Sequence, residues 1–429
     1  MFSSHKTIYL DHASTTPLDP AVFQAMKPFL QESYANPSAL YKLGTEAKQA
    51  IEGARKTVAS FLSTTDDTII FTRGGTHSIN IALLGAVRRH AHVGKHIITS
   101  TIEHHAVLNV MIQLESEGFD ITYLPVDEYG FVTAQQVNNA IRPDTILISI
   151  MYANNEIGTI EPIADIGKML LQYRKKNKTQ YPYFHTDACQ GAGSLDVSVE
   201  KIHVDLLSFN GSKIYGPKGT GVLYRRRGVE LEPIQFGGGQ EFGLSPGTED
   251  VAGIVGLGKA VAICTEQFSK NNRQISDLRE YLWKGIQESI EHVVLNGPPL
   301  ADFSPYQGEL EGVHSNIQRL IKKRPLPTSP DRGGECMRLP NNLNISFLGA
   351  ESESVILYLD AKGICVSSGS ACTTDSDELS HVLEACGYDK KRMISSIRFS
   401  LGRSTTKKDI DYVLKVLPGI IEKVRTMNL

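Results

Sequence analysis

The sequence predicts an α/β protein with a mostly parallel sheet in a large domain, followed by a smaller α+β domain. From about Pro17 to Glu266, short apolar runs alternate with longer helical stretches. This alternation is typical of a parallel sheet that is covered by helices on both faces. After residue 266 the pattern changes, and only a few strand-like runs are mixed with helices. The predicted domains are therefore 17–266 and 267–429.

Seven short runs in the large domain are rich in β-branched and aromatic residues and are predicted to be strands. They are 68–72, 96–100, 121–126, 145–151, 183–188, 204–210 and 221–226. Helices are predicted at 21–33, 46–62, 163–176 and 251–268, and two strands of the small domain at 343–348 and 396–401. Since ligands bind at the carboxyl ends of the strands in such sheets, residues that follow strands are the candidates for a site.

Composition excludes several classes of function. With 429 residues, of which 41% are hydrophobic and 21% charged, the chain is long enough for a large and a smaller folded domain. A net charge of −3 and a pI near 6.5 give no electrostatic reason to expect nucleic acid or an anionic membrane as a partner. No apolar run of membrane-spanning length is evident, and the N-terminus lacks the apolar core of a secretory signal. A cytoplasmic location is therefore expected.

The cysteines do not predict a disulfide framework or a zinc site. Six are present, at Cys189, Cys264, Cys336, Cys365, Cys372 and Cys386. They are far apart, and none forms a C-x-x-C pair, so no bound metal is expected.

A lysine and an aspartate at neighbouring strand ends indicate a cofactor. Lys213 follows the strand at 204–210 among glycines that let the backbone pass close to a ligand, and Asp187 lies at the end of the strand at 183–188. Pyridoxal 5'-phosphate (PLP) binds to a lysine amine, and its protonated ring nitrogen pairs with an acid. Taken alone, the two residues fit a surface lysine and a solvated aspartate equally well.

Further segments favour the PLP interpretation. They lie, in order, at 9–20, 36–44, 71–80, 96–108, 145–158, 185–190, 213–221, 236–241, 246–258, 366–383 and 396–406. In this order and spacing the chain resembles the cysteine desulfurases of the class V aminotransferase superfamily, whose relatives include selenocysteine lyase. The resemblance implies the PLP-dependent transferase fold type I, with residues 1–16 packed against the small domain.

The resemblance also implies roles around the cofactor ring. Lys213 would carry PLP covalently, and Asp187 would pair with the pyridinium nitrogen. Gln190 would donate to the phenolic oxygen of the cofactor. Asn155 would contact the ring and the substrate. His104 would stack on the ring face and act as a proton shuttle.

The phosphate site implied by the resemblance departs from the usual family pattern. Gly75 and Thr76 open a predicted helix, whose N-terminus attracts an anion. Asn210 and Ser212 would complete the phosphate cup in place of the usual residues. Thr248 matches a threonine that reaches the phosphate from the neighbouring subunit, which implies a homodimer with shared active sites.

Two residues are candidates for handling the substrate. Cys372 lies in a run of small and polar residues, which is an unusual setting for a buried thiol. By resemblance, its thiolate attacks the sulfur of the substrate L-cysteine, which leaves alanine and an enzyme persulfide. Arg398 matches the residue that clamps the substrate carboxylate.

Alternatives remain open at this point. Pro246 and the GRSTT segment at 402–406 favour selenocysteine lyase, for which selenocysteine would be the substrate. Arg73 and His77, which replace usual phosphate-site residues, suggest a non-catalytic relative of the same fold. Residues 301–340 are rich in Pro, Gly and Ser, and they are predicted to be a flexible insertion, either solvated or a docking loop. The protein that accepts the sulfur is not indicated.

Overall fold

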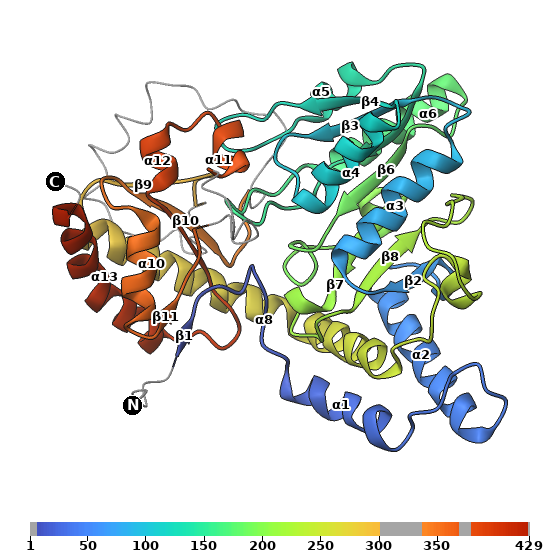
Figure 1. The fold of residues 1–429 in the computed structure, drawn as a ribbon. Coiled ribbons are helices and arrows are strands. Elements are labelled where there is room, and N and C mark those ends of the chain that lie inside the picture. The colour runs from blue at the N-terminus through green and yellow to red at the C-terminus, as the bar shows by residue number, and fades with distance from the viewer. Residues whose placement is uncertain (1–6, 301–336, 369–378, 428–429) are drawn as a thin grey trace, which may run out of the picture.

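Two domains lie side by side, and one long helix runs between them (Figure 1). The computed structural model describes residues 7–300, 337–368 and 379–427. Cys372 and most of the predicted insertion, residues 301–336, lie outside the described residues.

The large domain is built on a seven-stranded sheet of order β2-β8-β7-β6-β5-β3-β4. Its strands are β2 (Ile69–Thr72), β3 (His96–Ser100), β4 (Asp120–Leu124), β5 (Thr145–Ser149), β6 (Tyr183–Asp187), β7 (Leu206–Asn210) and β8 (Gly221–Arg225). The pairs from β4 to β7 are parallel, whereas β8 is antiparallel to both β7 and β2. The predicted mostly parallel sheet is confirmed.

Helices cover both faces of this sheet, as its doubly buried strands require. One face packs against α1 (Pro20–Gln31), α2 (Lys42–Phe61), α6 (Ile163–Asn177) and the first part of α8 (Val251–Ser289). The other face packs against α3 (Gly75–Arg89) and α4 (His105–Ser116). Successive side chains of β2 point to opposite faces of the sheet. Phe71 packs in the core under α1, α2, α6 and α8, and Ile70 packs in the core under α3 and α4. The short helices α5 (Ala134–Ala140) and α7 (Val199–Ile202) lie in the connections.

In its described residues, the small domain combines two short sheets with several helices. In one sheet, β10 (Asn342–Phe347) pairs antiparallel with β9 (Val293–Leu295) and β12 (Ser396–Ser400). In the other, the N-terminal strand β1 (Ile8–Tyr9) pairs in parallel with β11 (Ile364–Cys365). The helices are α10 (Ser352–Asp360), α11 (His381–Ala385), α12 (Lys390–Ile394) and α13 (Lys407–Met427). Ile8 and Leu10 belong to the small-domain core, so the N-terminal segment packs there.

Helix α8 serves both domains. Its first part contributes Leu257 and Val261 to the large-domain core, and its second part contributes Leu282 and Ile286 to the small-domain core. The helix was predicted to end at residue 268 but continues to Ser289, because apolar side chains recur along it and find a second core. The predicted boundary at 266/267 therefore lies inside one continuous helix.

Helix α8 also bears on the expectation that the chain has no apolar run of membrane-spanning length. Among the described residues it is the one helix long and apolar enough, by composition, to cross a bilayer, although no run of that length was expected. More than half of its most apolar window is buried inside the protein, as in the core helix of a folded domain.

The end of the predicted flexible insertion is an ordered part of the small domain. Arg338 is fully buried, and its backbone forms a bridge to Thr159. Its guanidinium donates to the carbonyl oxygens of Pro298, at 2.8 and 2.6 Å, and of Asn296. These carbonyl oxygens accept hydrogen bonds from the buried guanidinium of Arg338, a residue that composition alone assigned to a solvated loop.

Candidate active site

A cavity of about 240 Å³ lies where the parallel strands of the large domain end, next to β12 of the small domain. Its lining comes from residues that follow β3, β5, β6 and β7, from the start of α3, and from the N-terminal segment. The lining residues are Ala13, Ser14, Gly75, Thr76, Ile79, His104, Ala106, Met151, Ala153, Asn155, Asp187, Cys189, Gln190, Asn210, Lys213 and Arg398. Most of the residues predicted from the sequence thus meet in one place.

Lys213 presents an amine to this cavity from the short 3-10 turn η2 (Gly211–Lys213) that follows β7. Its Nζ donates to the carbonyl oxygen of Ser14, over 2.5 Å. Gly211 permits the tight passage of the backbone, because a Cβ at this position would lie 2.6 Å from Thr220 Oγ1. The amine is therefore held at the cavity wall by a neutral carbonyl.

Asp187 is the last residue of β6, and it is buried. Its Oδ1 accepts the backbone N–H of Cys189 at 2.9 Å, which fixes the carboxylate at the strand end. Burial, followed by the Asp187 charge, raises the pKa of the Cys189 thiol well above its usual value. Cys189 is therefore a protonated, unreactive part of the wall.

His104 caps the N-terminus of α4, where its Nδ1 accepts the N–H of Ala106 at 3.1 Å. Burial lowers the pKa of this imidazole, and the positive charge of Lys213 lowers it further, whereas Asp187 acts in the opposite direction. The ring is thus neutral at neutral pH. Since Nδ1 accepts a hydrogen bond, the proton of the neutral ring lies on Nε2.

The N-terminus of α3 opens onto the cavity through Gly75 and Thr76. Gly74 precedes it with a φ of 131°, a backbone conformation that favours glycine, and supplies no side-chain cap. A Cβ at Gly75 would lie 2.7 Å from Cys189 Sγ and 2.9 Å from Asn210 Nδ2, so a larger residue would require these side chains to shift. First-turn N–H groups of a helix, without a side-chain cap, suit a bound phosphate.

The other predicted phosphate-site residues divide into two groups. Asn210 lines the cavity, and its Oδ1 accepts the hydroxyl of Ser212 at 3.1 Å. Ser212 itself is not among the lining residues but supports Asn210. Thr248 is exposed and lines a separate pocket with Arg73, and it is not among the residues that line the cavity of its own chain.

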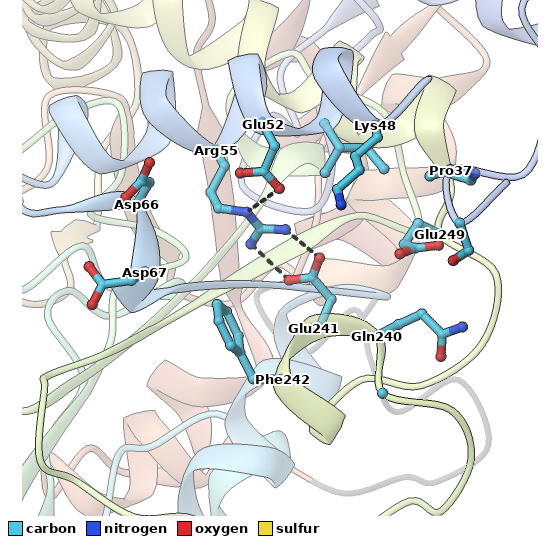
Figure 2. Close-up of a pocket in the computed structure, with 13 residues that line it drawn as sticks. Pro37, Lys48, Glu52, Arg55, Asp66, Asp67, Gln240, Glu241, Phe242 and Glu249 are labelled. Atoms are coloured by element: carbon cyan, nitrogen blue, oxygen red, sulfur yellow. Dashed lines mark hydrogen bonds and ion pairs between the residues drawn. The ribbon is translucent and has the colours of Figure 1, made fainter. Parts of the chain in front are cut away.

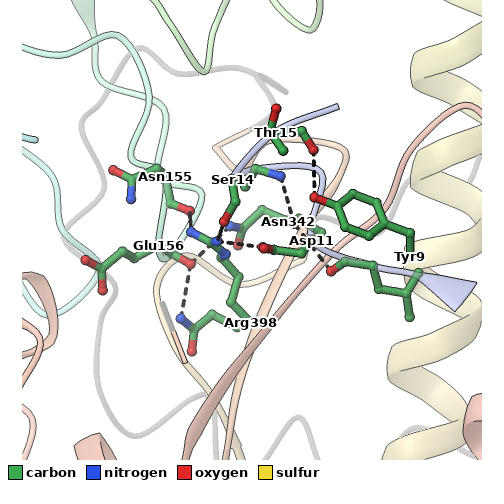
Figure 3. Close-up of polar contacts among 12 residues, drawn as sticks. Tyr9, Asp11, Ser14, Thr15, Asn155, Glu156, Asn342 and Arg398 are labelled. Carbon is green, nitrogen blue, oxygen red and sulfur yellow. Dashed lines mark hydrogen bonds and ion pairs between the residues drawn. The ribbon is translucent and has the colours of Figure 1, made fainter. Parts of the chain in front are cut away.

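Arg398 reaches the cavity from the middle of β12 and is only 2% exposed (Figure 3). Its Nη2 donates to Asp11 Oδ1 and to Ser14 Oγ, both at 2.8 Å. Its Nη1 donates to the carbonyl oxygen of Asn155 at 2.9 Å. Its Nε has no hydrogen-bond partner among the described residues. The guanidinium is thus held by three partners, and Nη1, which donates one of its two N–H groups here, retains a donor for a ligand.

Asn155 and Gln190 complete the predicted set. The Asn155 carbonyl holds Arg398, which leaves its side-chain amide on the cavity lining. Gln190 donates through Nε2 to the carbonyl oxygen of Ala13 at 2.9 Å and lines the same cavity.

Sequence reasoning missed Asp11 and Ser14. Both precede the large domain in the chain, yet Ser14 contacts Arg398 and Lys213 together, and Asp11 forms the ion pair with Arg398. Two signals were available: both residues lie in the segment 9–20 that contributes to the resemblance, and the charged Asp11 directly follows a short apolar strand.

These residues fit PLP by the chemistry of their donor set. A strand-end amine, a buried carboxylate and an uncapped helix N-terminus with a closely packed glycine all line one cavity. Together with the mostly parallel sheet, they define a PLP-dependent enzyme of the transferase fold type I.

Comparisons with known proteins agree with this class. The family model for aminotransferase class-V matches residues 8–323 and 329–413. The cysteine desulfurase IscS of Dictyoglomus turgidum is 45% identical over 99% of this chain and 96% of its own. Among solved structures, a NifS-like protein has a TM-score of 0.82 at 33% identity, and it covers 97% of this chain and 100% of its own. SspA in complex with cysteine has a TM-score of 0.74 at 35% identity, and it covers 93% and 100%.

The chain therefore belongs to the class V aminotransferase family. Within that family it belongs to the PLP-dependent cysteine desulfurases. The relatives do not favour selenocysteine lyase, and the residues gathered in the cavity do not favour a non-catalytic relative.

Proposed function

We propose that this protein is a PLP-dependent desulfurase that converts L-cysteine to L-alanine and keeps the sulfur as a persulfide on Cys372. The observation that carries the proposal is the convergence of Lys213, Asp187 and Arg398 on one cavity at the start of α3. The substrate class follows from the cysteine desulfurase relatives and from the neighbour that binds cysteine.

Different residues of the cavity would bind different parts of the cofactor. Lys213 would supply the amine that attaches PLP, and the N-terminus of α3 would hold its phosphate. Asp187 would be the acidic partner of the ring nitrogen, and PLP would supply an electron sink when bound. Neutral His104 carries its proton on Nε2 and can exchange one proton with a reacting group beside Lys213.

Arg398 binds the substrate carboxylate. Its guanidinium is fixed by Asp11, Ser14 and the Asn155 carbonyl, so binding needs little further ordering of the side chain. The planar donor set matches a carboxylate, which places the amino group and the sulfur of the substrate in a defined direction.

Cys372 accepts the sulfur. Its thiolate attacks the sulfur atom of the substrate, an S–S bond forms, and the C–S bond breaks. The electron pair of the broken bond stays with the organic fragment, which takes a proton and becomes alanine. The sulfur remains as the terminal atom of a Cys372 persulfide until an acceptor protein removes it.

Product analysis and chemical labelling test the proposal together. With cysteine and a thiol reductant, the holoenzyme should release alanine and sulfide in equal amounts. Borohydride reduction followed by peptide mapping should place the PLP label on Lys213. A label on another lysine, or no alanine from a fully loaded enzyme, would show that the proposed site is wrong.

A homodimer with shared active sites is part of the proposal. Thr248 is exposed and does not line the cavity of its own chain, which suits a residue that reaches the phosphate of a second copy. Sedimentation should give a dimer whose dissociation parallels the loss of PLP, and a monomer with full PLP occupancy would exclude sharing. We also propose a cytoplasmic location, which the free thiols Cys189, Cys264, Cys365 and Cys386 support.

A further inference from the structure

A buried ion pair joins Arg55 of α2 to Glu241 of the 3-10 turn η3 (Gln240–Gly243), beside the cleft shown in Figure 2. Arg55 Nη2 lies 2.6 Å from Glu241 Oε1, and Nη1 lies 2.9 Å from Oε2. The side chains are 8% and 5% exposed. The guanidinium also faces two rings, with its central carbon 4.8 Å from the centre of Phe71 and 5.9 Å from that of Phe242. Such a bidentate, stacked arrangement is specific to arginine.

The pair holds an unfavourable turn. Glu241 has a φ of 49° and Phe242 a φ of 61°, and Gly243 follows with a φ of 76°. Residues other than glycine avoid this left-handed region, so two of them in succession need contacts outside the turn to keep them there. Strain of this kind is retained where the surrounding structure imposes it, often near functional sites.

Glu241 also binds the turn to the edge of the large sheet. Its Oε2 accepts the backbone N–H of Phe71 at 2.7 Å, and Arg55 Nη1 donates to the carbonyl oxygen of Ile69 at 2.7 Å. Both backbone groups belong to β2, the edge strand, which leads directly to Gly74 and the N-terminus of α3. The turn is thus fixed to the strand that precedes the phosphate-binding residues.

The segment after the turn carries Thr248. Hydrogen bonds hold the chain on both sides of Thr248. Before it, Gln240 Oε1 accepts the N–H of Gly247 at 3.2 Å. After it, Asp250 caps α8 by accepting the N–H of Gly253 at 2.9 Å. Between these points Thr248 remains exposed. The direction in which Thr248 points therefore depends on the turn.

We propose that the Arg55–Glu241 pair is a positioning element for PLP binding in the second copy of the chain. The pair fixes the turn at 241–243, and the turn presents Thr248 to the phosphate held by the partner. This inference rests on the proposed homodimer with shared sites. If the pair only stabilised its own chain, its loss would lower thermal stability and leave the PLP affinity of the partner unchanged.

Mixed dimers separate these two roles. One subunit carries Lys213→Ala, and the other retains Lys213, so lysine-bound PLP reports a single site. Glu241→Gln is then placed either in the Lys213→Ala subunit or in the subunit that retains Lys213, and PLP is titrated by absorbance. The change in the Lys213→Ala subunit should raise the dissociation constant about tenfold or more, the loss expected when one hydrogen bond to a charged phosphate is removed. The change in the other subunit should have a much smaller effect.

A matched control uses another ion pair on the same cleft. Asp67 lines the cleft and pairs with Arg227 at 2.7 Å, but both side chains are exposed. Asp67→Asn should therefore leave the dissociation constant of PLP unchanged. If Glu241→Gln does not fold, the double variant Arg55→Met/Glu241→Met removes the pair without leaving a buried charge, and it should weaken PLP binding in the partner in the same way.

The outcomes are distinguishable. A dimer whose PLP affinity does not respond to Glu241→Gln or to the double variant in the opposite subunit would overturn this inference and leave the proposed shared site intact. A parent protein that is monomeric with full PLP affinity would overturn both.

Discussion

The guanidinium of Arg398 donates a hydrogen bond to the carboxylate of Asp11 over 2.8 Å, and so joins β12 to the N-terminal segment. The two residues are 387 positions apart in the chain. Because Arg398 is buried, this ion pair compensates a charge that would otherwise be costly inside the protein. It also sets the direction of the guanidinium before any substrate arrives.

Replacing this acid should affect substrate binding more than the later chemistry. In Asp11→Asn the hydrogen bond to Arg398 can persist, but the compensating charge is lost. We expect the KM for cysteine to rise several-fold with a smaller change in kcat, and the free energy of unfolding to fall by about 1–3 kcal/mol. Steady-state kinetics and urea unfolding measure the two effects. An unchanged KM would show that Asp11 does not orient the clamp.

Gly75→Ala should weaken PLP binding. The new Cβ would lie 2.7 Å from Cys189 Sγ and 2.9 Å from Asn210 Nδ2, so the wall beside the phosphate must shift. We expect a loss of stability of about 1–3 kcal/mol and a lower PLP affinity, measured by thermal unfolding and absorbance titration. The double variant Gly75→Ala/Cys189→Ala removes the nearer clash and should recover part of the affinity. No recovery would mean that the contact with Asn210 dominates.

His12 should make the fold less stable in mild acid. It is 3% exposed, neither ring nitrogen has a partner among the described residues, and burial lowers its pKa from 6.5 to about 4. Between pH 6.5 and 4, the imidazole of His12 binds a proton in the unfolded chain but not in the folded chain. The free energy of unfolding therefore falls as the pH drops towards 4. The loss from this residue is about 3 kcal/mol.

His12→Phe tests this origin of the acid sensitivity. The replacement keeps an aromatic ring of similar size, so the ring contacts with Tyr9 and Tyr215 can be kept. At pH 7 the stability should stay within about 1.5 kcal/mol of the parent, and the decline between pH 6.5 and 4 should become shallower. Denaturant unfolding across this range gives the comparison. An identical pH profile would assign the decline to other groups.

Cys372→Ser should abolish alanine formation from cysteine. Sulfur transfer needs a thiolate as acceptor, and a hydroxyl at this position cannot take its place. The PLP absorbance should remain, because Lys213, Asp187 and the N-terminus of α3 are unchanged. Cys264→Ser is a suitable control, since burial raises the pKa of that thiol to about 11. If Cys372→Ser forms alanine from cysteine at the parent rate, Cys372 does not accept the sulfur.

Much of the large domain could be predicted from the sequence, because its strands are buried on both faces and stand out as short apolar runs. The site followed from the same pattern: Asp187 and Asn210 end strands, and Lys213 follows one directly, so all three meet at one edge of the sheet.

The remaining features depend on contacts that are distant in the chain. Asp11 and Arg398 show no local pattern that pairs them. Composition predicts a solvated loop around Arg338, whereas the carbonyl oxygen of Pro298, 40 residues away in the chain, accepts hydrogen bonds from its buried guanidinium. The length of α8 was underestimated for a related reason, since a second core, built from the C-terminal part of the chain and from Ile8 and Leu10, supports its second part.

The N-terminal segment has a consequence for how the protein is made. Strand β1 pairs with β11, and the backbone of His12 donates to the carbonyl oxygen of Ser400, so residues 8–12 cannot form these contacts until nearly the whole chain has left the ribosome. The strands of the large-domain sheet, as far as the structure describes it, all precede residue 226, so this sheet can form earlier. Ser14 can therefore contact Lys213 before Arg398 has been synthesised. A nascent chain that ends before β12 has Lys213 but lacks Arg398, the residue proposed to bind the substrate carboxylate.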